Sequence, residues 1–181
     1  MSDREALLLD ACSLINLYAT RRIAEILAGH PGRFCVVDVA RREAGYVLRG
    51  GDGPDATERE PLDLEPLERD GLLATLTAES EEELRTYIEL TLEMDDGESM
   101  TGAIAIHRRF RVVTDDRKAL RVLAERGVPC STSLNLIKGW SEQMDVNAEV
   151  LRAVLLDLRQ RARYLPHRTH PLRDWWDEVI G

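Results

Sequence analysis

The sequence has few aromatic residues and few cysteines, and it has no long apolar run. Phe, Trp and Tyr make up only 5% of the 181 residues. The three cysteines, Cys12, Cys35 and Cys130, show no CxxC spacing, which argues against a zinc site or a disulfide framework and favours a reducing compartment. No apolar run approaches the ~20 residues that span a bilayer, and no secretory signal is recognisable at the N-terminus. We therefore expect a cytoplasmic protein with no membrane partner.

Positive charge is also in short supply. The chain carries 24 Lys and Arg against 33 Asp and Glu, a formal net charge of -9. Modules that only bind nucleic acid are usually basic, so this balance argues against such a module. It does not argue against a nuclease, because carboxylates that bind metal add to the negative count. The length fits one domain, and a hydrophobic content of 44% is enough for its core.

Short apolar runs alternate with segments of helical periodicity along most of the chain. Strands are expected at 6–9, 33–37, 111–114 and 128–131, with a further short strand at 72–77. Helices are expected at 14–27, 39–47, 80–94, 97–108, 116–126 and 133–143. Ser80 and Glu83 have the spacing of a capping box at the start of one of them. This alternation predicts a three-layer α/β/α fold with a central parallel sheet of about four to five strands.

The last part of the chain has a different pattern. An apolar row typical of one long helix comprises Leu151, Val154, Leu155, Leu158, Ala162 and Leu165. We therefore predict an α/β domain at 1–145 and a helical C-terminal extension at 146–181. The extension packs either on the same core or on a partner. Trp175 and Trp176 lie near its end, and their role stays open.

Acidic residues follow several of the expected strands. In a parallel α/β sheet, sites form at the carboxyl ends of the strands. Four segments offer carboxylates there: Asp10 after the first strand, Glu43 in the helix after the second, Asp96 and Glu98 at the start of helix 97–108, and Asp115 and Asp116 after strand 111–114. An aspartate at a strand-to-helix junction is also an ordinary helix N-cap, so no single member of this set is diagnostic.

Carboxylates that gather at one edge repel one another, and a cation relieves the repulsion. A set made only of oxygen donors, without His or Cys, suits a hard ion such as Mg²⁺ or Mn²⁺. Such ions activate water and stabilise a phosphoryl transition state. The sequence therefore favours a divalent metal ion as the group that balances the negative charge of Asp10.

Four motifs, in this order, resemble the PIN-domain family, toxin type. They are LLLDACSLINL, VVDVARREAGYVL, LEMDDGESMTGAIAI and RVVTDDRKALRVLAERGVPCSTSLNLI, which together cover roughly residues 6 to 140. The chain departs from a minimal member of the family by an insertion around 50–69 and by the tail. The third motif reads DDGE where many members carry a lone Asp.

The resemblance implies a Mg²⁺- or Mn²⁺-dependent endoribonuclease, often the toxin of a bacterial toxin–antitoxin pair, which leaves a 3′ hydroxyl and a 5′ phosphate. Its catalytic acids would be Asp10, Glu43, Glu98 and Asp116. The metal ligands would come from Asp10, Asp96, Glu98, Asp115 and Asp116, where Asp96 is an alternative to Glu98 and Asp115 an alternative to Asp116. Ser13 would orient Asp10, and it could also cap the helix that follows. Asn16 would either face the same cleft or be a surface or capping amide.

Basic residues must attract RNA to so negative a site. Arg41 and Arg42 precede Glu43, and Arg117 and Lys118 follow Asp116. Each of them could equally belong to an ordinary solvated helix face. We expect RNA as substrate, with an antitoxin, another protein or a second copy of the chain as candidate partners.

Two rival interpretations fit the sequence less well. A phosphatase of the haloacid dehalogenase type requires a second Asp where this chain has Cys12, and the layout of a response-regulator receiver does not match. The alternative that stays open is a catalytically silent PIN module that only binds a protein.

Overall fold

The structure, a computed structural model, describes residues 5–51 and 55–181. Its chain forms two compact units, each assembled from three separate stretches. Unit 1 comprises Met1–Leu14, Pro31–Gly45 and Asp63–Ser133. Unit 2 comprises Ile15–His30, Tyr46–Leu62 and Leu134–Gly181.

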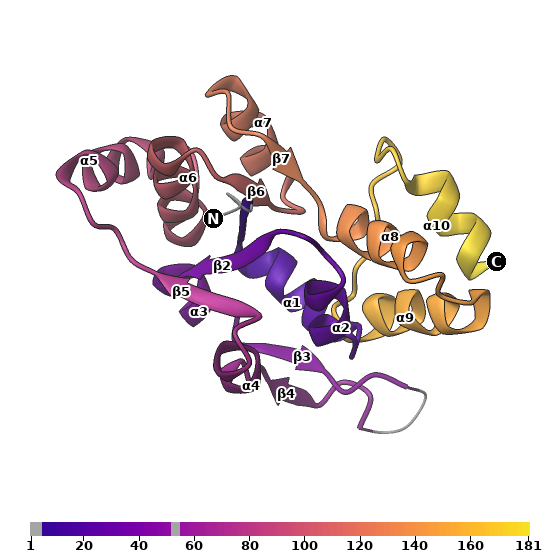
Figure 1. The fold of residues 1–181 in the computed structure, drawn as a ribbon. Helices are drawn as coiled ribbons and strands as arrows, with labels where there is room; N and C mark the ends of the chain where they lie inside the picture. Colours follow the sequence, from indigo (N-terminus) through magenta and orange to yellow (C-terminus); the bar gives the residue numbers. More distant parts are fainter. Residues whose placement is uncertain (1–4, 52–54) are drawn as a thin grey trace. The chain divides into compact units, whose positions relative to one another are not determined.

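Unit 1 holds a five-stranded sheet in the order β5-β2-β1-β6-β7, in which every neighbouring pair is parallel (Figure 1). The strands are β1 (Ala6–Leu9), β2 (Arg33–Val37), β5 (Leu73–Leu76), β6 (Arg111–Val113) and β7 (Cys130–Ser131). All four residues of the central strand β1 are buried, as an apolar run between two parallel neighbours should be.

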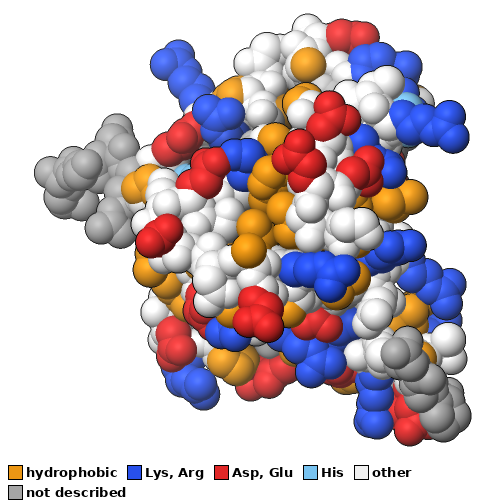
Figure 2. Space-filling model, turned by 90° about the vertical axis from the view of Figure 1, so that its right-hand side faces the viewer, with side chains coloured by type: hydrophobic (Ala, Val, Ile, Leu, Met, Phe, Trp, Pro, Cys, Tyr) orange, Lys and Arg blue, Asp and Glu red, His pale blue; other side chains and the backbone are white. Residues whose placement is uncertain are grey.

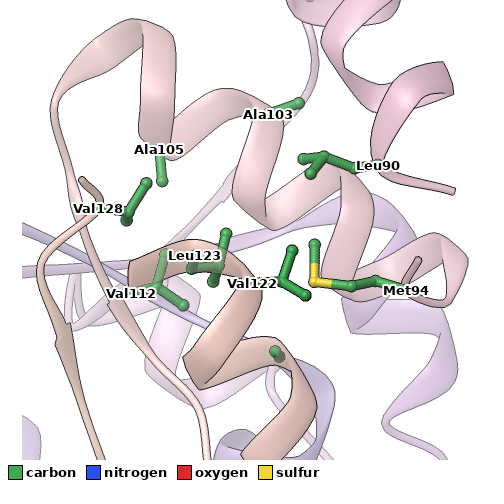
Figure 3. Packing of buried hydrophobic residues seen from close by; sticks show 9 residues of the cluster. Leu90, Met94, Ala103, Ala105, Val112, Val122, Leu123 and Val128 are labelled. Carbon is green, nitrogen blue, oxygen red and sulfur yellow. The ribbon is translucent and has the colours of Figure 1, made fainter. Parts of the chain in front are cut away.

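The helices of unit 1 are α3 (Asp38–Glu43), α4 (Glu65–Arg69), α5 (Glu81–Leu90), α6 (Asp96–Arg108) and α7 (Arg117–Glu125). Figure 3 shows side chains of α7 turned toward α5 and α6: Val122 lies near Met94, and Leu123 lies beside Val112 of β6. Gly102 of α6 permits this close packing, because a Cβ there would lie 2.8 Å from Leu123 Cδ2 and 3.0 Å from Leu90 Cδ1.

Unit 2 contains α2 (Ile23–Ala28), the antiparallel pair β3 (Tyr46–Leu48) and β4 (Arg59–Pro61), α9 (Ala148–Arg161) and α10 (Arg173–Ile180). Two helices cross the division: α1 (Ala11–Ala19) begins in unit 1, and α8 (Ser133–Gln143) begins at its last residue. Arg161, buried, joins three segments of unit 2 by donating to Ala19 O at 2.9 Å, Leu48 O at 3.1 Å and Glu60 Oε2 at 2.9 Å.

The predicted fold class is confirmed: the protein is α/β, with a central parallel sheet flanked by helices and with further helices at the C-terminus. Of the two tryptophans near the end, Trp176 is buried and meets Tyr164 edge-to-face at 5.6 Å between ring centroids. None of the helices in the described part of the chain has the length and apolar content needed to cross a membrane.

Several local expectations differ from the structure. The tail helix expected to include Leu165 ends at Arg161, and the helix expected at 80–94 ends at Leu90. The helix expected at 14–27 is two helices, because Arg21 adopts a left-handed conformation with φ 58° and breaks the path. The helix expected at 39–47 ends at Glu43, and Tyr46–Leu48 pairs with β4 as a strand. Ser13 does not cap α1; its backbone N–H donates to Asp10 Oδ1 at 2.7 Å, so Asp10 is the capping side chain.

A buried ion pair holds the start of α5 to the end of α6. Arg108 Nε donates to Glu83 Oε1 at 2.6 Å, and its second nitrogen donates to Glu83 Oε2 at 3.0 Å and to Thr77 O at 2.8 Å. The Glu83 side chain is 4% exposed. The hydrogen bonds from Arg108 lower the pKa of Glu83 to about 2, and the Glu79 N–H adds to the effect. Ser80 caps the helix by accepting from the Glu83 N–H, as its spacing predicts.

Replacing Glu83 by glutamine should therefore destabilise the protein by roughly 3 kcal/mol at neutral pH. Because the folded-state pKa lies below the ordinary 4.5, the stabilisation by Glu83 is complete above about 4.5 and is lost as the pH falls toward about 2. Urea unfolding of wild type and Glu83→Gln between pH 7 and pH 3 measures this difference.

Glu82→Gln is the matched control, since Glu82 lies in the same first turn but is exposed. We expect its effect to stay within about 0.5 kcal/mol. Equal losses in the two variants would show that the Arg108 pair is not the source of the stability.

Candidate functional site

Asp10 lies directly after β1 and is 3% exposed. Its carboxylate accepts from the Ser13 N–H at 2.7 Å and from the Cys12 thiol, whose Sγ lies 3.2 Å from Oδ1 and 3.1 Å from Oδ2. The Thr114 hydroxyl also bonds to it. Burial nevertheless dominates and raises the pKa of Asp10, although each of these hydrogen bonds acts to lower it.

Ser13 hydrogen-bonds to the ends of two neighbouring strands, β1 and β6, next to the Asp10 carboxylate. Its buried hydroxyl lies 2.7 Å from Val113 O at the end of β6 and 3.2 Å from Asp10 O at the end of β1. The expected role of Ser13 in orienting Asp10 therefore has a geometric basis in both its N–H and its hydroxyl. Asn16 lies further along α1 and is buried, which excludes the surface amide, and its expected place at the cleft stays a prediction.

The loop after β6 carries Asp115 and Asp116. Asp116 is the N-cap of α7, and its Oδ1 accepts from the Lys118 N–H at 2.7 Å and the Ala119 N–H at 2.9 Å. Its own N–H donates to Thr114 Oγ1 at 3.1 Å. Asp115 Oδ1 accepts from the Ser133 N–H at 3.2 Å. Both acids are half-buried. Asp116 caps its own helix, as the N-cap interpretation of such residues predicts, whereas Asp115 accepts from the first residue of α8.

The start of α6 contributes Asp95, Asp96 and Glu98. Burial, together with the charges of Asp95, Asp116 and Asp10, raises the pKa of Glu98 to about 7. These interactions indicate that the carboxylates after β1, at the start of α6 and in the β6–α7 loop lie near one another. Asp96 is exposed and accepts from the Tyr87 hydroxyl at 3.2 Å. Of the two alternatives in this segment, Glu98 therefore has the closer electrostatic tie to Asp10 and Asp116.

Glu43, at the end of α3, reaches the same region. Its Oε1 accepts from the Gly97 N–H at 3.1 Å. Burial raises its pKa, and the charges of Asp95, Asp96 and Asp10 act in the same direction. A Cβ at position 97 would overlap Glu43 Oε2 and lie 2.8 Å from its Cδ. The glycine therefore makes room for this carboxylate.

The basic residues that were expected to attract RNA have different surroundings. Arg41 donates twice to Glu68, at 3.0 Å each, and Arg42 pairs with Asp38 at 2.9 Å. Arg117 and Lys118 are exposed in the first turn of α7, directly after Asp116. Acidic and basic side chains are interspersed on the face that Figure 2 draws.

The sequence interpretation gave no role to Cys12, Gly97 or Tyr87, and it used Thr114 only as part of a motif. Of these, Gly97 has a recognisable signal, because a glycine in the first turn of a helix often marks a close approach. The Cys12 thiol, which also accepts from the Asp115 N–H at 3.3 Å, joins segments 103 residues apart, and no local pattern reports such a contact.

Among the described residues, no three His, Cys, Asp or Glu side chains are already arranged to hold a metal ion. No protein-family model matches the chain, and no curated protein matches it either.

The fit between Gly97 and Glu43 is testable through stability. Gly97→Ala should stabilise a Glu43→Ala background by up to about 1 kcal/mol, because alanine favours a helix and the three atoms nearest to the added Cβ, all of Glu43, are then absent. In wild type the added Cβ displaces the Glu43 carboxylate from its hydrogen bond, so most of that gain should vanish. A double-mutant cycle by urea unfolding measures the coupling.

Gly139→Ala is the control, since a Cβ at this helical glycine meets nothing within 4 Å. It should stabilise both backgrounds equally. Equal gains from Gly97→Ala in the two backgrounds would contradict the close fit.

Proposed function

We propose that the protein is a metal-dependent endoribonuclease of the PIN type that hydrolyses RNA phosphodiester bonds. One observation carries the proposal: the pKa of Glu98 is raised to about 7 by burial and by three carboxylates, two of which, Asp10 and Asp116, come from other segments. Strongly perturbed acids gathered at strand ends are typical of catalytic sites. The four motifs and their order support the same class.

The donor chemistry fits a hard divalent ion. The acids of the cluster offer oxygens, and Asp10, Glu98 and Asp116 would hold the ion. Mg²⁺ commonly takes one or two carboxylates and completes its shell with waters and substrate phosphate, so it does not need a preformed cage of three side chains. When bound, Mg²⁺ or Mn²⁺ would lower the pKa of a coordinated water and offset charge in the transition state.

The residues of the chain have separate tasks in this proposal. The Ser13 N–H, the Cys12 thiol and the Thr114 hydroxyl hold the Asp10 carboxylate in place. The Gly97 N–H holds Glu43 at the rim, either as a direct ligand or through water. Asp116 Oδ1 already caps α7, which leaves Oδ2 available for a cation.

Arg117 and Lys118 would contact the RNA backbone beside Asp116. Arg41 and Arg42 already have acidic partners, so a role in RNA binding would require them to exchange Glu68 and Asp38 for phosphate. We propose further that the protein acts in the cytoplasm, as a toxin of a toxin–antitoxin pair or in a related defence system, with an antitoxin as its protein partner.

The test is cleavage of a mixed pool of single-stranded and structured RNA with Mg²⁺, with Mn²⁺ and with EDTA. Wild type should cleave only with a metal. Asp10→Asn and Asp116→Asn should lower the rate by at least about 100-fold, because each removes a charge that holds the cation. Thermal unfolding with and without Mn²⁺ should show stabilisation of wild type that both variants lose.

Asp70→Asn is the control, an exposed acid at the C-terminal end of α4. It should cleave like wild type. If wild type neither cleaves RNA nor gains stability from Mn²⁺, the chain is instead a silent module that binds a protein.

Lys118→Ala should weaken RNA binding and reduce the slope of log affinity against log salt by roughly one unit, because one phosphate contact is lost. Binding of a short single-stranded RNA to the inactive Asp10→Asn background, measured across salt concentrations, checks this. Arg69→Ala, at an exposed position on α4, should leave the slope unchanged. An unaltered slope in Lys118→Ala would remove that residue from the RNA contact.

A further inference from the structure

The end of α9 and the loop that joins it to α10 (Figure 1) have a charge balance opposite to that of the whole chain. Residues 158–173 contain five arginines and two histidines but no Asp or Glu, whereas the formal net charge of the chain is -9. This segment follows the four motifs and lies wholly in unit 2. A local excess of positive charge on a negative chain favours contact with an anionic partner.

Two of the five arginines hold the fold. Arg161 is buried and donates to three separate segments of unit 2. Arg173 Nη1 donates to Pro166 O at 2.8 Å, and Arg173 Nε donates to Asp177 Oδ2 at 2.7 Å. The guanidinium groups of Arg161 and Arg173 therefore already have partners within the protein.

The other three arginines, Arg159, Arg163 and Arg168, are exposed. None of their side chains forms an ion pair with another residue of the described chain. Six acidic residues of unit 2 each pair with a different basic residue: Glu25, Glu58, Glu60, Glu142, Asp157 and Asp177. The three exposed guanidinium groups thus face solvent while these acids are engaged elsewhere.

The backbone fixes the positions of these three arginines. Arg159 lies in the last turn of α9, and Arg163 follows the helix end in a left-handed conformation with φ 54°. Arg168 lies in a turn that is closed by the His170 N–H, which donates to His167 O at 2.9 Å. An ordered backbone lowers the entropic cost of binding a partner.

The macrodipole of α9 offers another explanation for part of this pattern. Cations are favourable near the C-terminal end of a helix, which accounts for Arg159 and for Arg163 beside it. The dipole acts only within the last turn, so it does not account for Arg168 in the loop. It also does not account for the lack of acidic residues up to residue 173.

We propose that residues 158–173 form a second RNA-binding surface, in which Arg159, Arg163 and Arg168 contact the phosphate backbone without reading the base sequence. The segment contains no lysine, and the planar guanidinium fork of arginine matches two phosphate oxygens at once. The choice of RNA as the nucleic acid rests on the proposed function, whereas the recognition of phosphate rests on the arginines alone.

The exposed surface of the segment favours a nucleic acid over a membrane or a protein. Among residues 158–173, all of which the structure describes, Leu165 is the one large apolar side chain that is strongly exposed, at 59%. Binding in a bilayer interface or to a protein buries several apolar side chains. Contact with a phosphate backbone requires only the charged groups.

The proposed nuclease also needs such a surface. A chain with a net charge of -9 repels a polyanion. Near the acidic cluster, Arg41 and Arg42 already pair with Glu68 and Asp38. Three arginines without acidic partners in unit 2 would add attraction that the acidic cluster itself does not provide.

The test is the binding of a fluorescently labelled single-stranded RNA to the full chain, measured by anisotropy across salt concentrations in EDTA. The triple variant Arg159→Gln, Arg163→Gln, Arg168→Gln should bind at least about tenfold more weakly at low salt. Its slope of log affinity against log salt should be smaller by about two units, because each lost contact with a single strand removes about 0.7.

The matched control is the triple variant Arg69→Gln, Arg85→Gln, Arg109→Gln, at exposed positions of unit 1. It has the same net charge as the first triple variant, and it also replaces one arginine in a left-handed conformation, Arg109 with φ 57°. Its affinity and its salt slope should equal those of wild type. Circular dichroism checks that both variants are folded.

Three results would overturn the proposal: no binding of RNA by wild type at low salt, an unchanged slope in the first triple variant, and equal losses in the two triple variants, which would reduce the effect to net charge. Single-stranded DNA of the same sequence should bind no more tightly than RNA, and tighter binding would overturn the choice of RNA. If the first triple variant loses binding to phosphatidylglycerol vesicles but not to RNA, the surface binds lipid instead.

The assay in EDTA separates this proposal from the ribonuclease proposal, since it requires neither metal nor cleavage. A chain that binds RNA through these arginines but never cleaves it would refute the ribonuclease and keep the binding surface. A chain that cleaves RNA with metal but whose first triple variant binds like wild type would keep the ribonuclease and refute the surface.

Discussion

The buried carboxylate of Asp10 is the constraint on which the site depends. A charge at the end of an apolar strand costs free energy unless it is solvated or paired. Here the Ser13 N–H, the Cys12 thiol and the Thr114 hydroxyl provide partial solvation, and the pKa of Asp10 still rises. Because the Ser13 hydroxyl bonds to the carbonyl groups that end β1 and β6, the same turn fixes both the carboxylate and the strand ends beside it.

The sheet and the positions of the acids could be predicted because they depend on local pattern. Four-residue apolar runs, helix caps such as Ser80 and the order of acidic segments are all visible in the chain. The failures follow from tertiary or backbone effects. Residue propensities do not predict the left-handed conformation of Arg21, which divides the first long helix. The pairing of β3 with β4 overrides a helical pattern at Tyr46–Leu48.

The same distinction holds within the candidate site, between the acids that a local pattern proposes and the groups that hold them. Asp10, Glu98 and Asp116 could be proposed because each stands at a strand end or a helix start. The groups that hold them act across the fold: Gly97 reaches Glu43 over 54 residues, and Cys12 reaches Asp115 over 103. A sequence shows which residues are chemically able to act, whereas the contacts that orient them appear only once the sheet has been assembled.

Two glutamates on neighbouring helices show why stability alone does not account for the acidic cluster. Glu83 faces a guanidinium, and its pKa falls to about 2, so its charge stabilises the fold. Burial, together with the charges of Asp95, Asp116 and Asp10, raises the pKa of Glu98 to about 7, so its charge opposes the fold at neutral pH. The residue type is the same, but Glu83 is hydrogen-bonded to a guanidinium, whereas Glu98 is partly buried among like charges. Carboxylates that destabilise one another gain a role once a cation lies among them, which is the physical reason for proposing metal-dependent chemistry at this cluster.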